Sequence, residues 1–414
     1  MADSVLVTNI SELVTFEPLT RSPYQALVTE EDLGIIKDAW FLVKNGKIEA
    51  FGEKDGWKSF AYKNIPRVNA EGSLVLPGLV DSHTHVLYGG DRSEEFSSRL
   101  EGKTYEEIAS AGGGIYSSVK KTMEASEEDL LSSARKRVKN FLSHGVTSLE
   151  IKSGYSFSWQ EDLRQLRLLN RIKEESLQTI CVTALPLHVL PKEQSAKNYI
   201  KELVDYFLPI VSKEGLADFV DMFIEEGYYK TSDCEPFLKK AKELGLGIKI
   251  HADEFTRGGG SKLAADWGAV SADHLQHASY EDKKALAEAQ VVATLLPGTS
   301  LYAKIPYTQA RGFLEAGCQL AVASDHNPGS CQLSNLPMLA SLAALHCGLT
   351  APAALAAVTF MGARALSLET KKGALAKSYD ADFLILPFHH YKVWIASFGE
   401  FKPKQVWVKG KRVI

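Results

Sequence analysis

Hydrophobic and polar positions follow two different patterns along the chain. Near the N-terminus, short apolar runs alternate with turn residues in "SVLVTNISELVTF", "DAWFLVKNGKIEAFGEKDG" and "SLVLPGLV". Such runs predict β-strands, and the Asn45-Gly46 pair predicts a tight hairpin turn. The C-terminal end returns to this pattern in "ADFLILP", "VWIASF" and "KQVWVKGKRVI", and we expect a strand in each. Both chain ends are therefore predicted to build one small β domain around a long insertion.

The middle of the chain alternates short apolar runs with longer helical patterns that have charged faces. Two of these predicted helices lie in "SEEDLLSSARKRVKNFLSHG" and "SWQEDLRQLRLLNRIKEES". The eight apolar runs are "GLVDSHTH", "GVTSLEIKSG", "TICVTALPLH", "FVDMFIEEG", "GIKIHADEF", "VSADHLQH", "VVATLLPG" and "CQLAVASDHNPG". Strand-then-helix units repeated in this way over about 300 residues predict an α/β fold of the (β/α)8 TIM-barrel type.

The two patterns predict a division of the chain into two domains. We expect the barrel over residues 76–370 and a composite β-sandwich domain over residues 1–75 and 371–414. A doubly wound open sheet is the alternative fold, but it would normally carry a GxGxxG or GxxxxGK[ST] motif, and neither occurs. The runs Gly112-Gly113-Gly114 and Gly258-Gly259-Gly260 are instead interpreted as loop glycines that permit close backbone approach.

Composition excludes several classes of protein. The chain has 414 residues, of which 45% are hydrophobic, and a net charge of -4, so nothing suggests a nucleic-acid partner. The start "MADSVLVTNISELVTF" lacks the features of a signal peptide, and no window resembles a membrane span. The five cysteines are scattered and never form a CxxC pair. We expect a cytoplasmic protein without disulfides or a thiolate zinc site.

The first apolar run of the barrel ends on two histidines, His83 and His85, one residue apart. In a strand, side chains at positions i and i+2 point to the same face, so both imidazoles can reach one metal ion. An HxH pair can also be purely structural. Its position decides between the two, because catalytic groups of a barrel lie at the C-terminal ends of the strands.

Three other runs end on candidate ligands, His251, His274 and Asp325. Buried imidazoles and carboxylates are unfavourable without partners, so their recurrence at the ends of several strands indicates a shared site. Three neutral imidazoles and one carboxylate suit Zn²⁺ or Fe and leave room for a water molecule. The sequence therefore predicts a catalytic metal centre.

This arrangement resembles the amidohydrolase superfamily, with HxH on the first strand, histidines on the fifth and sixth, and an aspartate on the eighth. Within it, the chain is similar to the imidazolonepropionase family over nearly its whole length. The shared motifs are "PGLVDSHTHVLYGGDRSEEF", "GGGIYSSV", "GVTSLEIKSGY", "IHADEF", "ADHLQH" and "ASDHNPGS". Two segments depart from the family pattern, "ALPLHVLP" around His188 and "HLQH", which adds His277 as a structural or outer-shell candidate.

The resemblance implies roles for individual residues. It implies one divalent or trivalent ion, Zn²⁺ or Fe, and leaves Lys152 outside the ligand set, with a carboxylated Lys152 bridge as the alternative. The implied metal ligands are His83, His85, His251 and Asp325, and the implied catalytic residues are Glu254, His274 and Asp325. The implied substrate contacts are Arg92, Tyr155, His188, Glu254, Asn327, Gly329 and Ser330.

The implied reaction is hydrolysis of 4-imidazolone-5-propanoate to N-formimino-L-glutamate in histidine degradation, by a homodimer. One alternative is a deaminase-like enzyme acting on a neutral ring, which would not need Arg92. Another is a non-catalytic scaffold, which the intact ligand set argues against. Arg92 itself has a simpler interpretation, an ion pair with Glu94 or Glu95 at the protein surface.

Overall fold

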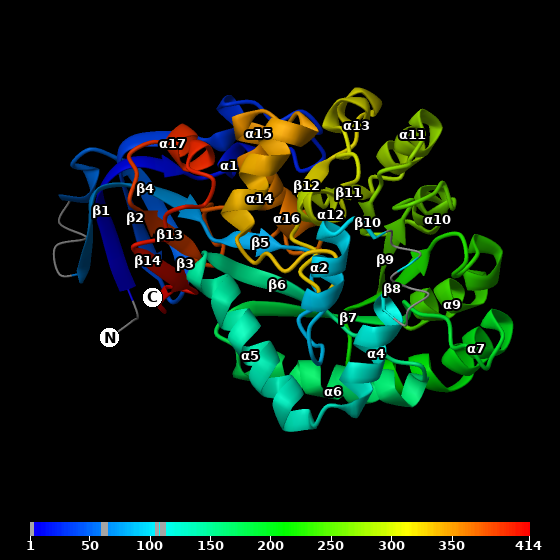
Figure 1. Ribbon diagram of the computed structural model, residues 1–414. Coiled ribbons are helices and arrows are strands. Elements are labelled where there is room, and N and C mark those ends of the chain that lie inside the picture. Colours follow the sequence, from blue (N-terminus) through cyan, green and yellow to red (C-terminus); the bar gives the residue numbers. More distant parts are fainter. Residues whose placement is uncertain (1–3, 59–64, 104–106, 108–112) are drawn as a thin grey trace.

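The computed structural model describes residues 4–58, 65–103, 107 and 113–414 (Figure 1). Two bodies are visible, a barrel and a separate sheet beside which both chain ends lie. The barrel sheet has eight strands in the order β12-β11-β10-β9-β8-β7-β6-β5, and neighbouring strands are parallel. Its strands are β5 (Leu79–Asp81), β6 (Val146–Lys152), β7 (Thr179–Leu187), β8 (Phe219–Ile224), β9 (Gly247–Ala252), β10 (Ser271–His274), β11 (Val292–Leu295) and β12 (Leu320–Val322).

The first and last barrel strands meet just beyond their C-terminal ends. Thr84 forms a parallel bridge with His326. The backbone N–H of Asp325 donates to the carbonyl of His83 at 3.0 Å, and that of His85 donates to the carbonyl of His326 at 2.8 Å. This contact nearly closes the barrel and brings the HxH pair beside Asp325. Each predicted run contains one strand, so the predicted barrel is confirmed.

Helices connect the strands and cover the outside of the barrel (Figure 1). The two predicted long helices are present, and each begins after a serine cap, Ser126 before α5 and Ser158 before α6. The helices of this body are α2 (Ser93–Leu100), α4 (Ile115–Glu124), α5 (Glu127–Ser143), α6 (Trp159–Glu175), α7 (Ala196–Glu202), η4 (Leu203–Phe207), α8 (Leu208–Glu214), α9 (Thr231–Glu243), α10 (Gly260–Trp267), α11 (Tyr280–Glu288), α12 (Pro297–Ala303), α13 (Ala310–Ala316), α14 (Leu336–Leu342), η5 (Ala343–Cys347), α15 (Ala351–Ala357) and α16 (Phe360–Arg364).

The second body is a mixed seven-stranded sheet, the chain-end sheet, with the order β15-β14-β13-β4-β1-β2-β3. Strand β4 pairs with β1 on one side and with β13 on the other, which joins the two chain ends as predicted. Its strands are β1 (Ser4–Val14), β2 (Ile35–Lys44), β3 (Lys47–Glu53), β4 (Arg67–Pro77), β13 (Phe383–Leu386), β14 (Gln405–Val408) and β15 (Lys411–Arg412). Short helices α1 (Glu17–Arg21), η1 (Glu31–Leu33) and η2 (Gly56–Lys58) belong to the same N-terminal part of the chain.

The chain-end sheet curls over its own apolar core. Phe41 of β2 and Phe383 of β13 lie with ring centroids 4.9 Å apart, although β1 and β4 separate their strands in the sheet. At the predicted hairpin, the N–H of Ala381 donates to the carbonyl of Gly46 at 2.8 Å. Asn45 and Gly46 have φ of 52° and 75°, as a tight turn requires. One curled sheet thus supplies both layers of the predicted sandwich. The exact domain boundaries stay a prediction.

One predicted strand is wrong. The segment "VWIASF" lies largely in a helix, α17 (Tyr391–Ala396), whose first turn is capped by the His390 side chain. Its buried residues are Tyr391, Trp394 and Ile395, which recur at helical spacing. Aromatic and β-branched residues favour strands by composition, but here the spacing of the buried residues determines the structure.

One of the predicted loop glycines, Gly260, lies close to a barrel strand. A Cβ atom on Gly260 would lie 2.8 Å from Ala252 Cα, so this glycine does permit close approach, while Gly112 lies outside the described residues.

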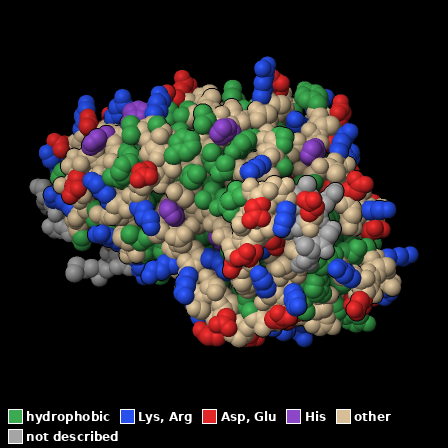
Figure 2. Space-filling view, in the orientation of Figure 1, with side chains coloured by type: hydrophobic (Ala, Val, Ile, Leu, Met, Phe, Trp, Pro, Cys, Tyr) green, Lys and Arg blue, Asp and Glu red, His purple; other side chains and the backbone are tan. Residues whose placement is uncertain are grey.

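All five cysteines are buried with free thiols. Among the described residues, no helix combines the length and hydropathy of a transmembrane segment. Lys and Arg side chains are interspersed with Asp and Glu over the face shown in Figure 2.

Candidate active site

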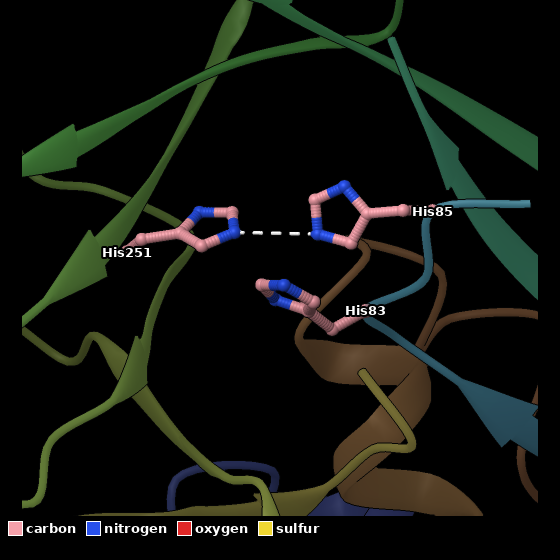
Figure 3. A group of neighbouring side chains, drawn as sticks. All are labelled: His83, His85 and His251. Atoms are coloured by element: carbon pink, nitrogen blue, oxygen red, sulfur yellow. Dashed lines mark hydrogen bonds between the residues drawn. The ribbon is translucent and has the colours of Figure 1, made fainter. Parts of the chain in front are cut away.

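The four predicted metal ligands converge at the C-terminal ends of the barrel strands. Figure 3 shows the imidazoles of His83, His85 and His251 around one space, and the Nε2 atoms of His85 and His251 are 3.4 Å apart. The Asp325 Oδ1 atom lies 3.6 Å from the Nε2 atoms of both His83 and His85. His274 joins this group, because its ligand atom and those of His83 and Asp325 lie within 4.8 Å of one another.

Two buried carboxylates orient the histidines toward this space. The Nδ1 atom of His83 lies 2.6 Å from Asp273 Oδ2, and that of His251 lies 2.9 Å from Asp221 Oδ2. Asp273 accepts the Nδ1 proton of His83, so the His83 Nε2 atom presents a lone pair to the shared space, and Asp221 lies beside His251 as its ion-pair partner. Within the described residues, His83 Nε2 is buried without a hydrogen-bond partner. A buried unpaired acceptor is unfavourable, and this donor set therefore fits a metal ion.

A buried ion-pair network lies beneath the ligands and consists of Glu150, Lys152, Asp221, Lys249 and Asp273, none of which is exposed to solvent. The Lys152 ammonium lies 2.9 Å from Glu150 and 2.8 Å from Asp221. Lys249 donates to the carbonyl of Ser82 at 2.9 Å and lies 3.7 Å from Asp273. Asp221 and Asp273, the two carboxylates that orient the histidines, are therefore themselves held by the lysines of this network.

The carboxylates of this network favour the charged form of Lys152. Burial lowers the pKa of Lys152, but the charges of Asp221 and Glu150 outweigh burial and raise the pKa above its usual value. A protonated ammonium has no lone pair, so it cannot coordinate a metal or react to form a carbamate. Two carboxylates thus engage the Lys152 nitrogen, which favours a place for Lys152 outside the ligand set, and the carboxylated bridge stays the alternative prediction.

Every predicted site residue except the deeper His83 lines one pocket above the ligands. Its walls come from loops that follow many of the barrel strands, which is where a barrel enzyme holds its active site. The predicted residues that line it are His85, Arg92, Tyr155, His188, His251, Glu254, His274, Asp325, Asn327, Gly329 and Ser330.

Two neighbouring ionisable groups in the pocket, Glu254 and His274, have shifted pKa values. Burial, together with the negative charges of Asp325 and Glu225, raises the pKa of Glu254 well above its usual value. Burial lowers the pKa of His274 well below its usual value, so this imidazole is neutral at pH 7. Its Nδ1 atom lies 3.5 Å from Glu254 Oε1. A neutral imidazole next to a carboxyl group with a raised pKa suits acid–base chemistry.

Asp325 occupies the border between the ligands and the pocket. Its Oδ2 atom accepts a hydrogen bond from Thr299 Oγ1 at 2.6 Å, while Oδ1 faces the histidines. Burial raises the pKa of Asp325 to about 6. The Oδ1 atom can therefore reach an ion shared with the histidines, while Thr299 holds Oδ2 in place.

Arg92, Tyr155 and His188 form another part of the pocket wall. The Arg92 guanidinium pairs with Glu95, so the ion pair considered for Arg92 exists, but it is largely buried and the Arg92 side chain also lines the pocket. The His188 ring stacks on His85 with a centroid distance of 5.1 Å, and the Tyr155 ring lies 5.4 Å from His188. Burial lowers the pKa of His188 to about 3, which leaves a neutral imidazole.

Asn327 organises the loop that follows Asp325. Its Nδ2 atom donates to the carbonyl of Asp325 and to Ser330 Oγ, both at 2.7 Å. Its Oδ1 atom accepts from the N–H groups of Gly329 and Ser330 at 2.8 and 2.7 Å. These bonds engage the amide within its own loop. The resemblance implies that Asn327 contacts the substrate, and this stays a prediction. In the structure the Asn327 amide sets the shape of the loop.

Sequence reasoning missed several functional neighbours. Asp221 and Asp273 stand inside apolar runs, and a carboxylate in a buried strand was a signal that could have identified them. Arg99, Phe223 and Tyr228 also line the pocket, and no local pattern predicts this. The outer-shell candidate His277 has an exposed side chain that does not line the pocket, and its backbone N–H donates to the carbonyl of Asp253 at 2.9 Å.

Comparison with known proteins identifies the class. A family model described as the amidohydrolase family matches residues 74–413. The fold is shared with atrazine chlorohydrolase from Arthrobacter aurescens complexed with zinc, at 16% identity, a TM-score of 0.73 and coverage of 99% of this chain and 95% of that one. An adenosine deaminase from Xanthomonas campestris with bound zinc matches with a TM-score of 0.68 and 16% identity, covering 99% of this chain and 92% of that one. The chain belongs to the amidohydrolase family.

Relatives at higher identity narrow the assignment. The imidazolonepropionase of Clostridium tetani is 39% identical over 94% of this chain and 93% of its own length. Those of Geobacillus kaustophilus and Bdellovibrio bacteriovorus are each 38% identical over 99% of this chain and cover 97% and 96% of the relatives. Within the amidohydrolases, the chain groups with the imidazolonepropionases.

Proposed function

We propose that this protein hydrolyses 4-imidazolone-5-propanoate to N-formimino-L-glutamate, the third step of histidine degradation, by cleaving the cyclic C–N amide bond. The observation that carries this proposal is an arginine, Arg92, in the same pocket as the histidine and aspartate ligands. A guanidinium is suited to bind a carboxylate, and this substrate carries one on its propionate chain. The names of the full-length relatives agree with this reaction.

One metal ion is proposed at the site, held by His83, His85, His251 and Asp325. The nitrogen and oxygen donors are compatible with Zn²⁺ and with Fe. Such an ion supplies a nucleophile at neutral pH, because it lowers the pKa of a bound water from 15.7 toward about 7. All other steps are assigned to side chains of this protein.

Three side chains are proposed to move protons and stabilise charge. Asp325 accepts the proton of the attacking water, whose oxygen forms a bond to the ring carbonyl carbon. The neutral His274 donates a hydrogen bond to the carbonyl oxygen as negative charge develops there. Glu254, with its raised pKa, gives a proton to the ring nitrogen as the C–N bond breaks. The ring then opens to a single product molecule, which carries the new carboxyl group and the formimino nitrogen.

The substrate is proposed to be held away from the reacting bond. Arg92, Tyr155 and His188 bind the propionate, and the loop with Asn327, Gly329 and Ser330 closes the pocket around it. Holding the chain fixes the ring in the geometry of attack. We further propose that the protein acts as a cytoplasmic homodimer on this small molecule, and this proposal rests on the family resemblance.

Arg92→Ala tests the substrate. We expect kcat/KM for the carboxylated ring to fall roughly 30- to 1,000-fold, because a charge-assisted contact at a partly buried site contributes about 2–4 kcal/mol. A neutral ring analogue lacks this contact, so it should react slowly with the wild type and hardly more slowly with the variant. Arg92→Lys should restore little, since an ammonium lacks the planar fork. Equal losses for both rings would favour a neutral-ring enzyme instead.

A further inference from the structure

Glu95 is the residue that contacts the Arg92 guanidinium. Both belong to the segment that begins α2, and their side chains are largely buried, with 14% and 13% of their surfaces exposed. The Glu95 Oε2 atom accepts hydrogen bonds from Arg92 Nε at 2.8 Å and from Nη2 at 2.7 Å. One carboxylate oxygen therefore holds one edge of the guanidinium.

The second carboxylate oxygen of Glu95 has a different partner. Its Oε1 atom accepts a hydrogen bond at 3.1 Å from the backbone N–H of Gly114, the residue that precedes α4. The next residue, Ile115, lines the active-site pocket. Glu95 thus joins Arg92 to a second element of the pocket wall, so its carboxylate cannot rotate without breaking one of the two contacts.

The other side of the guanidinium lies against the loop that follows Asp325. A Cβ atom on Gly329 would lie 1.8 Å from Arg92 Nη1, so only glycine leaves room for this approach. The guanidinium is therefore enclosed between Glu95 on one edge and the backbone at Gly329 on the other. Because the Gly329 loop begins at a metal-ligand candidate, the enclosure fixes Arg92 relative to the reacting centre.

We propose that Glu95 is a positioning residue, which holds the Arg92 guanidinium at the pocket wall so that its remaining N–H groups meet the carboxylate of the substrate. This inference rests on the proposed function, because it assumes that Arg92 binds a carboxylate. The alternative is that Glu95 competes with the substrate for Arg92, and this alternative predicts the opposite change in substrate binding when Glu95 is replaced. If Glu95 competed with the substrate for the guanidinium, its removal would strengthen binding rather than weaken it.

The sign of the change in KM distinguishes positioning from competition. In Glu95→Gln the negative charge is lost, and we expect KM for imidazolone propionate to rise about 10-fold while kcat changes less than about threefold. Glu94→Gln is the matched control, because Glu94 is the neighbouring acid on the same helix and is exposed. It should leave both constants unchanged. A lower KM in Glu95→Gln would overturn positioning in favour of competition.

A double-mutant cycle tests whether Glu95 acts through Arg92. Once Arg92→Ala is present, adding Glu95→Gln should change KM less than about twofold, since nothing is left to position. A full 10-fold increase in that background would assign Glu95 to anchoring Gly114 and overturn the inference. If the wild type turns over the substrate and Glu95→Gln has an unchanged KM, the positioning role of Glu95 is overturned, while the proposed function stands. No turnover of the carboxylated ring by the wild type would remove the proposed function and this inference together.

Discussion

The barrel interior beneath the site and the interior of the chain-end sheet are equally buried but chemically different. Beneath the site lie the charged side chains of the buried ion-pair network, each fully buried. Between the layers of the chain-end sheet lie apolar side chains, with Phe383 stacked on Trp407 at a centroid distance of 5.1 Å. The interior beneath the site is thus ionic, and the interior around Phe383 is apolar.

The difference shows what each interior contributes. Apolar packing stabilises a fold through buried area but has little direction. Buried ion pairs contribute little net stability, because desolvation offsets their attraction, but their geometry is specific. In this protein the directed contacts end on His83 and His251 through Asp273 and Asp221. We therefore expect changes in the network to affect the metal, and changes in the chain-end sheet to affect stability alone.

The largest expected effect is that of His251→Ala. A four-ligand site that loses one imidazole binds its ion weakly and no longer fixes the attacking water, so both metal and hydrolysis should fall to background. Elemental analysis of the purified variant and a turnover assay measure the two losses. His277→Ala is the control, because His277 is an exposed histidine outside the pocket, and it should retain both.

The next largest effect is expected in the chain-end sheet. Phe383→Ala removes a fully buried ring and should lower the free energy of unfolding by about 3–5 kcal/mol. Urea unfolding measures this loss. At temperatures where the variant is folded, kcat and metal content should equal those of the wild type. A folded variant with a reduced kcat would mean that the chain-end sheet also shapes the site, which would break the comparison.

A smaller effect is expected for Asp273→Asn in the ion-pair network. The amide keeps the shape of the side chain but loses the charge that accepts the His83 Nδ1 proton, and such partners typically affect metal affinity 10- to 100-fold. Competition with a chelator measures the change. Asp266→Asn is the control, since Asp266 is exposed on α10. An unaltered metal affinity in Asp273→Asn would reduce the network to a structural role.

The sequence predicts the barrel and the ligand set well for physical reasons. The strands next to His251 and Asp325 are short buried runs, GIKIHA in β9 and LAV in β12, and each run ends where the site begins. The partners of the ligands are harder to predict. Lys249 and Asp273 lie on neighbouring strands far from His83 in sequence, and only the closed barrel brings them together.

Local composition misleads where the spacing of buried residues decides. The segment around Trp394 has the composition of a strand, but Tyr391, Trp394 and Ile395 form one buried face of a helix. The sequence offered both Glu94 and Glu95 as ion-pair partners of Arg92, because the two acids are adjacent, and the structure shows the pair with Glu95. The enclosure of Arg92 by Gly329 joins distant parts of the chain, and no local pattern announces it.

The most direct test of the account is turnover of freshly generated imidazolone propionate by the purified protein before chelation, after chelation and after addition of Zn²⁺ or Fe²⁺. The account predicts hydrolysis to N-formimino-L-glutamate with about one ion per chain, loss of turnover when the ion is removed, and recovery when an ion is restored. Full turnover by a protein that elemental analysis shows to be free of metal would contradict it.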